Sequence, residues 1–169
     1  HDVDEISRIA DRVLMLEHGG VVARGSTDEV LSRFGLEAGR NPYEQNSLLS
    51  GTINLEKTAD DLLAVSIGAD AIWLASDIDI ANGAQVRLKI PARDVSIALE
   101  RPKGISIQNM LAAQVISIEP TKRPAFQTVT LDISGQMLAA TVTRKAVADL
   151  SLAPGLAVYA LIKSATFHA

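Results

Sequence analysis

Beyond residue 46, apolar and polar positions alternate along the chain with a period of two. Val86, Leu88 and Ile90 alternate with polar neighbours, and residues 128–133 repeat the pattern. This period predicts strands with one buried face. Short apolar segments between turn signals predict further strands near 51–56, 61–67, 70–75, 94–99, 112–119, 136–143 and 156–163. With one short helix predicted at 144–150, the pattern indicates a mainly β fold of small closed barrels of the oligonucleotide/oligosaccharide-binding (OB) type.

The first 34 residues follow a different pattern, helix–hairpin–helix. Ile6, Ile9 and Val13 fit one helix face, and the apolar segments 13–16 and 21–23 flank Gly19-Gly20, a turn signal for a hairpin. Ser26 followed by Glu29 is a capping box that predicts a second helix through residue 34. Residues 35–46 carry glycine, asparagine and proline and are interpreted as a linker.

The β part of the chain contains a weak internal repeat. Residues 45–56 (QNSLLSGTINLE) and 108–119 (QNMLAAQVISIE) lie 63 positions apart and agree at five positions. The glycine-led segments 83–90 and 155–162 are also similar. Self-similarity at a fixed offset indicates duplicated units. We therefore expect two related barrels, at residues 47–100 and 101–169.

Composition excludes several functions. The net charge is −4 and aromatic residues make up 4% of the chain, which disfavours a nucleic-acid binder. There is no cysteine, and no His/Asp/Glu spacing resembles a metal site, so no metal is expected. The first residue is His1 rather than Met, which indicates a processed start or a piece of a longer protein.

Residues 1–33 resemble the tail of an ATP-binding-cassette ATPase. The run HDVDEISRIADRVLMLEHGGVVARGSTDEV carries the switch-loop His-Asp, the Ala-Asp-Arg-Val segment, a glycine turn and a Gly-x-x-x-Glu-Val helix in order. The resemblance implies that His1 contacts the γ-phosphate in the parent ATPase. A phosphate loop, a signature Ser-Gly and an acidic strand end for Mg²⁺ are absent from this sequence. We expect this fragment alone not to hydrolyse ATP, and ATP and Mg²⁺ to bind only the full-length parent.

Residues 43–169 resemble the C-terminal regulatory region of molybdate-importer ATPases, which is built from oxyanion-binding barrels of the Mop/TOBE type. The resemblance rests on IPARDVSIALERPKGISIQN (90–109) and TVTRKAVADLSLAPGLAVYALIKSA (141–165). Sugar-importer ATPases, which also carry C-terminal barrels, lack this ordered set. The resemblance implies a feedback sensor for molybdate or tungstate, a homodimer, a transmembrane permease partner, and a peripheral location on the cytoplasmic face of the bacterial inner membrane.

The resemblance also implies an oxyanion site. Molybdate is a tetrahedral dianion, so its site needs hydrogen-bond donors rather than acceptors. Ser106 and the amides of Ile107, Gln108 and Asn109 would form one wall. Thr143 and Lys163 would form the other, contributed by a different barrel or subunit.

Several positions depart from the pattern of stand-alone oxyanion-storage proteins. Gln108 stands where those proteins have Arg, and Ala146 replaces a Ser. In the first repeat, Tyr43 replaces the equivalent of Ser106 and Pro91 that of Lys163, so that repeat is interpreted as structural.

Each candidate residue also has an ordinary interpretation. Ser106 and Asn109 are typical turn residues, Thr143 is a typical helix N-cap, and a lysine at a strand end such as Lys163 is typically a solvated charge. The alternative function is accordingly a ligand-free dimerisation module of an importer ATPase.

Overall fold

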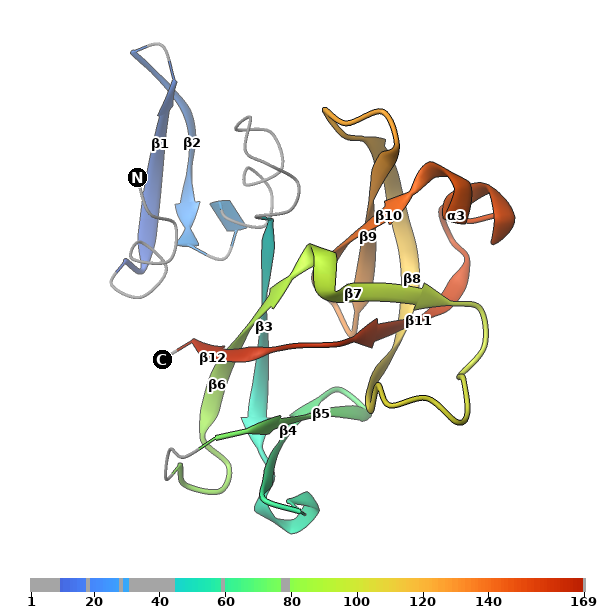
Figure 1. Ribbon diagram of the computed structural model, residues 1–169. Coiled ribbons are helices and arrows are strands. Elements are labelled where there is room, and N and C mark those ends of the chain that lie inside the picture. Colours follow the sequence, from blue (N-terminus) through green and yellow to red (C-terminus); the bar gives the residue numbers. More distant parts are fainter. Residues whose placement is uncertain are drawn as a thin grey trace.

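The computed structural model describes residues 10–17, 19–27, 29–30, 45–58, 60–76 and 80–168. These form one two-stranded hairpin and two five-stranded antiparallel sheets (Figure 1). The elements are β1 (Arg12–Glu17), β2 (Gly20–Ser26), β3 (Asn46–Ile53), η2 (Leu55–Lys57), β4 (Leu62–Ile67), β5 (Asp70–Ala75), β6 (Gln85–Pro91), η3 (Ala92–Asp94), β7 (Val95–Ala98), β8 (Asn109–Pro120), β9 (Phe126–Ile133), β10 (Gln136–Thr143), α3 (Arg144–Asp149), β11 (Ala157–Ile162) and β12 (Thr166–His168).

The predicted hairpin near the start of the chain is confirmed. Strands β1 and β2 pair antiparallel with Arg12 opposite Ser26, and Gly19 takes a φ of +82° in the turn between them. The predicted capping box also forms, because the Ser26 amide donates to Glu29 Oε2 at 3.1 Å and the Glu29 amide donates to Ser26 Oγ at 3.2 Å. The predicted helix at the start and most of the helix after Ser26 lie outside the described residues.

The two sheets exchange their last strands. We call β3–β7 the first repeat and β8–β12 the second. The first sheet has the order β12-β6-β3-β4-β5 and the second β10-β9-β8-β11-β7. Each sheet therefore contains four strands of one repeat and the fifth strand of the other. In Figure 1, the red β12 crosses from β11 to lie beside β6, while β7 runs beside β11. The predicted pair of related OB-like barrels is confirmed, in this interleaved form.

One hydrophobic core serves both repeats. Most of the alternating residues predicted to be buried are so: Leu88 and Ile90 on β6, and Val129, Leu131 and Ile133 on β9, whereas Val86 is half-buried. The buried residues join a single cluster that also contains residues of β3, β4, β5, β8, β10 and β11. Because burial of apolar surface is the main stabilising contribution to folding, the repeats stabilise each other directly.

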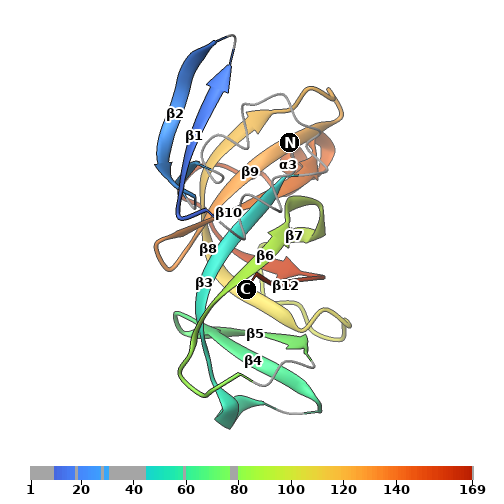
Figure 2. The same cartoon turned by 90° about the vertical axis from the view of Figure 1, so that its left-hand side faces the viewer.

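The long strand of the first repeat has an edge that the second repeat covers. Strand β3 pairs with β6 from Asn46 to Thr52 but with β4 only at Thr52 and Ile53. The edge left open along its first half meets β10, a contact we call the β3–β10 seam (Figure 2). There Ser47 Oγ accepts from the Ala139 amide at 2.9 Å. The side chain of Gln136 accepts from the Ser50 amide at 2.7 Å and donates to its carbonyl at 3.0 Å.

Two local predictions were inaccurate. The strand expected at 51–56 begins at Asn46 and ends at Ile53, because the Asn54 side chain accepts from the amides of Glu56 and Lys57 and starts η2. Strand β12 was not predicted, since three residues are too few to show a period. The predicted helix at 144–150 is confirmed as α3.

Candidate functional site

The segment that carries Ser106 ends the connection between β7 and β8. Ser106 and Gln108 are exposed, and Ile107 is half-buried. Within the described part of the chain, no group accepts a hydrogen bond from the amides of Ser106, Ile107 or Gln108. These three amides and the Ser106 hydroxyl are therefore donors that a ligand can use.

Lys163 lies beside this segment. Strands β8 and β11 pair with Asn109 opposite Ile162, so Lys163, which directly follows β11, and Gln108, which directly precedes β8, both adjoin this last pair. The Lys163 side chain is exposed, whereas its backbone amide donates to the Asp94 carbonyl at 2.9 Å. Strand pairing thus brings Lys163 to the same end of the second sheet as the 106–108 segment.

Asp94 and Ser164 are two polar residues near Lys163 that the sequence did not reveal. The Ser164 hydroxyl donates to Asp94 Oδ2, and Arg93 Nε lies 3.9 Å from Asp94 Oδ1. These contacts join η3, where the first repeat crosses between the sheets, to the crossing of the second repeat at 163–165. The contact between Asp94 and Ser164 joins residues about seventy positions apart in the sequence, so no local motif could have predicted it.

The side chain of Asn109 is hydrogen-bonded to the first repeat. Its Oδ1 accepts from the Trp73 amide at 2.8 Å, and its Nδ2 donates to the Trp73 carbonyl at 3.0 Å. Asn109 is 9% exposed, so these bonds are shielded from water. A few residues further along β8, the Ala112 amide donates to Asp70 Oδ2 at 2.8 Å. We call this contact the β5–β8 seam.

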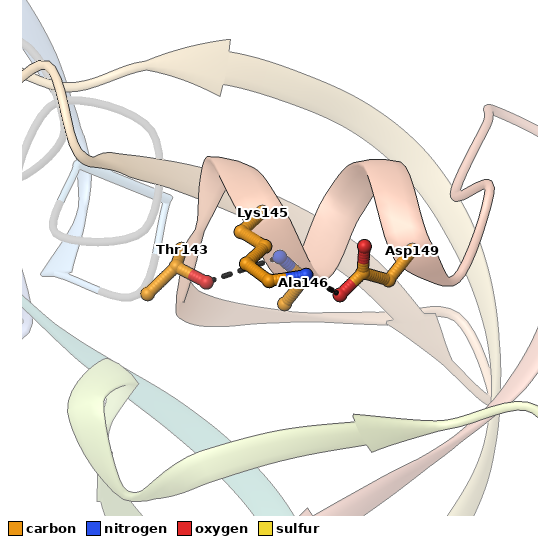
Figure 3. A network of polar contacts seen from close by, with 4 residues as sticks. All are labelled: Thr143, Lys145, Ala146 and Asp149. Carbon is orange, nitrogen blue, oxygen red and sulfur yellow. Dashed lines mark hydrogen bonds and ion pairs between the residues drawn. The ribbon is translucent and has the colours of Figure 1, made fainter.

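Thr143 is the N-cap of α3 (Figure 3). Its Oγ1 accepts from the Ala146 amide at 3.0 Å, and Lys145 pairs with Asp149 at 2.6 Å on the same helix. The N-cap interpretation of Thr143 is therefore correct. A hydroxyl both accepts and donates, so capping leaves the Thr143 O–H compatible with a ligand role.

Thr143 lies far along the sheet from the other candidates. Thr143 is opposite Phe126, and the neighbouring Gln127 is opposite Pro120, the last residue of β8. Asn109 is the first residue of β8. The structure therefore brings Lys163 to the Ser106–Asn109 segment and places Thr143 at the opposite end of β8.

The remaining candidates lie elsewhere. His1 and Tyr43 fall outside the described residues. Pro91, the last residue of β6, pairs with Asn46 as Ile162 pairs with Asn109, so Pro91 corresponds to Ile162 and the predicted equivalence with Lys163 was wrong by one residue. In the described ranges, no group of three or more His, Asp or Glu side chains is arranged to hold a metal ion. None of the described helices is long and apolar enough to cross a membrane.

Comparison with known proteins shows what the second repeat is similar to: residues 105–169 match the model of the TOBE domain. Over nearly its whole length the chain is similar to ATP-binding proteins of molybdenum import. It is 35% identical over 168 residues to ModC of Photorhabdus laumondii, covering 99% of this chain and 47% of that protein. It is 34% identical over 167 residues to ModC of Vibrio cholerae, covering 96% of this chain and 45% of that protein.

A solved structure supports the fold. The cytoplasmic molybdate-binding protein ModG, in a form with molybdate bound, superimposes with a TM-score of 0.61 at 24% identity and covers 78% of this chain. The predicted resemblance to the C-terminal part of molybdate-importer ATPases is confirmed by these relationships. The chain spans about half the length of the curated relatives it matches.

Proposed function

We propose that this chain is the regulatory C-terminal region of the ATPase subunit of a molybdate or tungstate importer and that it binds the oxyanion. The observation that carries the proposal is the pairing of β8 with β11, which brings the exposed residue Lys163 next to the segment of Ser106, whose amides have no acceptor among the described residues. A compact set of donors around one cation suits a tetrahedral dianion, since charge-assisted hydrogen bonds are the strong ones.

Thr143 fits this proposal only as a contribution from another copy. Within one chain it lies at the other end of β8 from Asn109. In a homodimer, the Thr143 hydroxyl of a second copy would complete the donor set, so oxyanion binding would join two subunits.

The regulatory part of the proposal follows from linkage. An oxyanion that binds one arrangement of the two subunits more tightly shifts the equilibrium toward that arrangement. In the parent protein, the favoured arrangement would hold the ATPase halves apart, so internal molybdate would slow its own uptake. The permease partner and the peripheral location at the cytoplasmic face of the inner membrane belong to the same proposal.

Titration calorimetry with molybdate, tungstate and sulfate tests the binding site. The wild-type chain should bind molybdate or tungstate in the micromolar range or tighter, and sulfate much more weakly. Replacing Lys163 by Ala should weaken molybdate binding by about tenfold or more, because a charge-assisted hydrogen bond contributes about 1.5–3 kcal/mol.

Lys57→Ala is the matched control, since Lys57 is an exposed lysine of η2 in the first repeat. It removes the same charge without touching the proposed site and should leave the affinity unchanged. Equal affinity of Lys163→Ala and wild type would remove Lys163 from the site. A dimeric wild-type chain that binds none of the three anions would instead be a dimerisation module, the alternative that the Gln108 and Ala146 departures favour.

A further inference from the structure

The connection that carries the proposed oxyanion donors is joined to the first repeat by a specific set of contacts. At the β5–β8 seam, the Asn109 side chain bonds both backbone groups of Trp73, and the Asp70 carboxylate accepts from the Ala112 amide. Asn109 directly follows Gln108, and Ala112 lies three residues further along β8. The first repeat therefore fixes β8 where the proposed donor segment ends.

The β3–β10 seam provides a symmetric reference that lacks a ligand segment. There Ser47, on the long strand β3, accepts a hydrogen bond from the backbone of β10, and Gln136, on β10, forms hydrogen bonds with the backbone of β3. In each seam, a side chain of the long strand (β3 or β8) forms a hydrogen bond with the backbone of the end strand (β10 or β5). A side chain of that end strand in turn bonds the backbone of the long strand. The two seams thus make comparable bonds, but only the β5–β8 seam borders Ser106–Gln108.

We propose that Asp70, in the first repeat, is a positioning residue for the oxyanion-binding segment of the second repeat. By accepting from the Ala112 amide, it holds the first residues of β8 against β5. Together with Asn109 it sets where the amides of Ser106, Ile107 and Gln108 point. The inference rests on the proposed function, and it assigns the first repeat, which lacks the ligand groups, a role in binding. Asp70 itself touches no oxyanion, since a carboxylate beside a dianion would repel it.

Two substitutions separate positioning from charge. Asp70→Asn retains an oxygen that accepts from the Ala112 amide and removes the negative charge, whereas Asp70→Ala removes both. If Asp70 acts by positioning, Asp70→Ala should weaken molybdate binding by about fivefold to tenfold, and Asp70→Asn should bind like wild type. If Asp70 acts only through its charge, both variants should gain affinity equally, and the proposal would be wrong.

Gln136→Ala is the matched control for a general loss of stability. It removes side-chain bonds of the β3–β10 seam, so it should lower the free energy of unfolding while leaving molybdate affinity within about twofold of wild type. An equal loss of affinity in Asp70→Ala and Gln136→Ala would reduce Asp70 to an ordinary stabilising residue and overturn the inference.

Hydrogen exchange tests the same inference without a ligand. In Asp70→Ala, the amides of residues 109–112 should exchange about tenfold faster than in wild type, while those of 46–52 stay unchanged; Gln136→Ala should show the reverse. If the wild-type chain binds no oxyanion, the proposed function fails, but this exchange pattern still decides whether Asp70 orders the segment. Unchanged exchange at 109–112 in Asp70→Ala would contradict the inference.

Discussion

At the scale of single residues, Gly68 lies at a point of close approach between the two repeats. It lies in the β4–β5 turn with a φ of +59°, and a Cβ added there would lie 2.1 Å from Ser134 Oγ in the β9–β10 turn. Ser134 itself has a φ of +51°. Equivalent hairpin turns of the two repeats are therefore in contact, and a side chain at position 68 would require Ser134 to shift.

Gly68→Ala should lower the free energy of unfolding by about 2–4 kcal/mol, which combines backbone strain with a steric clash. Gly83→Ala is the control: Gly83 has a φ of +81°, but nothing lies within 4 Å of its added Cβ. That variant should lose only about 1–2 kcal/mol, the cost of the backbone conformation. Urea denaturation measures both, and equal losses would show that the Ser134 contact is easily relieved.

At the scale of elements, the short helix α3 depends on its first residue. It spans six residues, too few to be stable alone, and Thr143 supplies the capping bond to Ala146. Any test of Thr143 as a ligand must therefore separate capping from donation to the anion.

Thr143→Ala should lower the free energy of unfolding by about 1 kcal/mol, because an uncapped helix leaves amides without acceptors. Thr143→Asn should restore most of this loss, since Asn is a strong N-cap. Thermal unfolding measures the stability and calorimetry with molybdate the affinity. If Thr143 only caps α3, Asn should also restore full molybdate affinity; if its hydroxyl bonds the anion, Asn should restore stability alone.

The sequence predicted most individual strands and little of how they combine. Residues 85–90, 128–133 and 136–143 were predicted because alternation and turn residues are local signals. The exchange of β7 and β12 could not be predicted, since a four-residue and a three-residue strand carry no information about their partners. For the site, the motif pointed to Lys163 and Asn109, but the bonds of Asn109 to Trp73 and of Asp70 to Ala112 connect positions about forty residues apart in different repeats.

At the scale of the whole molecule, the exchanged strands and the shared core make the two repeats one folding unit. The single tryptophan, Trp73, lies in the first repeat and contacts the second through Asn109. Its fluorescence therefore reports on the seam as well as on its own repeat.

Residues 45–168 should unfold in one cooperative transition. Trp73 fluorescence and far-ultraviolet circular dichroism should give coincident urea curves with the same midpoint. As a comparison, residues 45–100 expressed alone should stay unfolded, because the first sheet would lack β12 and β7 would have no strand to pair with. Two separate transitions, or a folded 45–100 fragment, would contradict this expectation.

The exchange of β7 and β12 bears on how such a chain arose. A molecule with only one set of five strands would have to obtain a fifth strand from a second molecule, and its stability would then rise with protein concentration. Joining two sets in tandem makes the same exchange intramolecular, at an effective concentration fixed by the connecting segment 99–108. Duplication thereby freed each half to diverge: one copy could lose its ligand groups while still completing the sheet of the other.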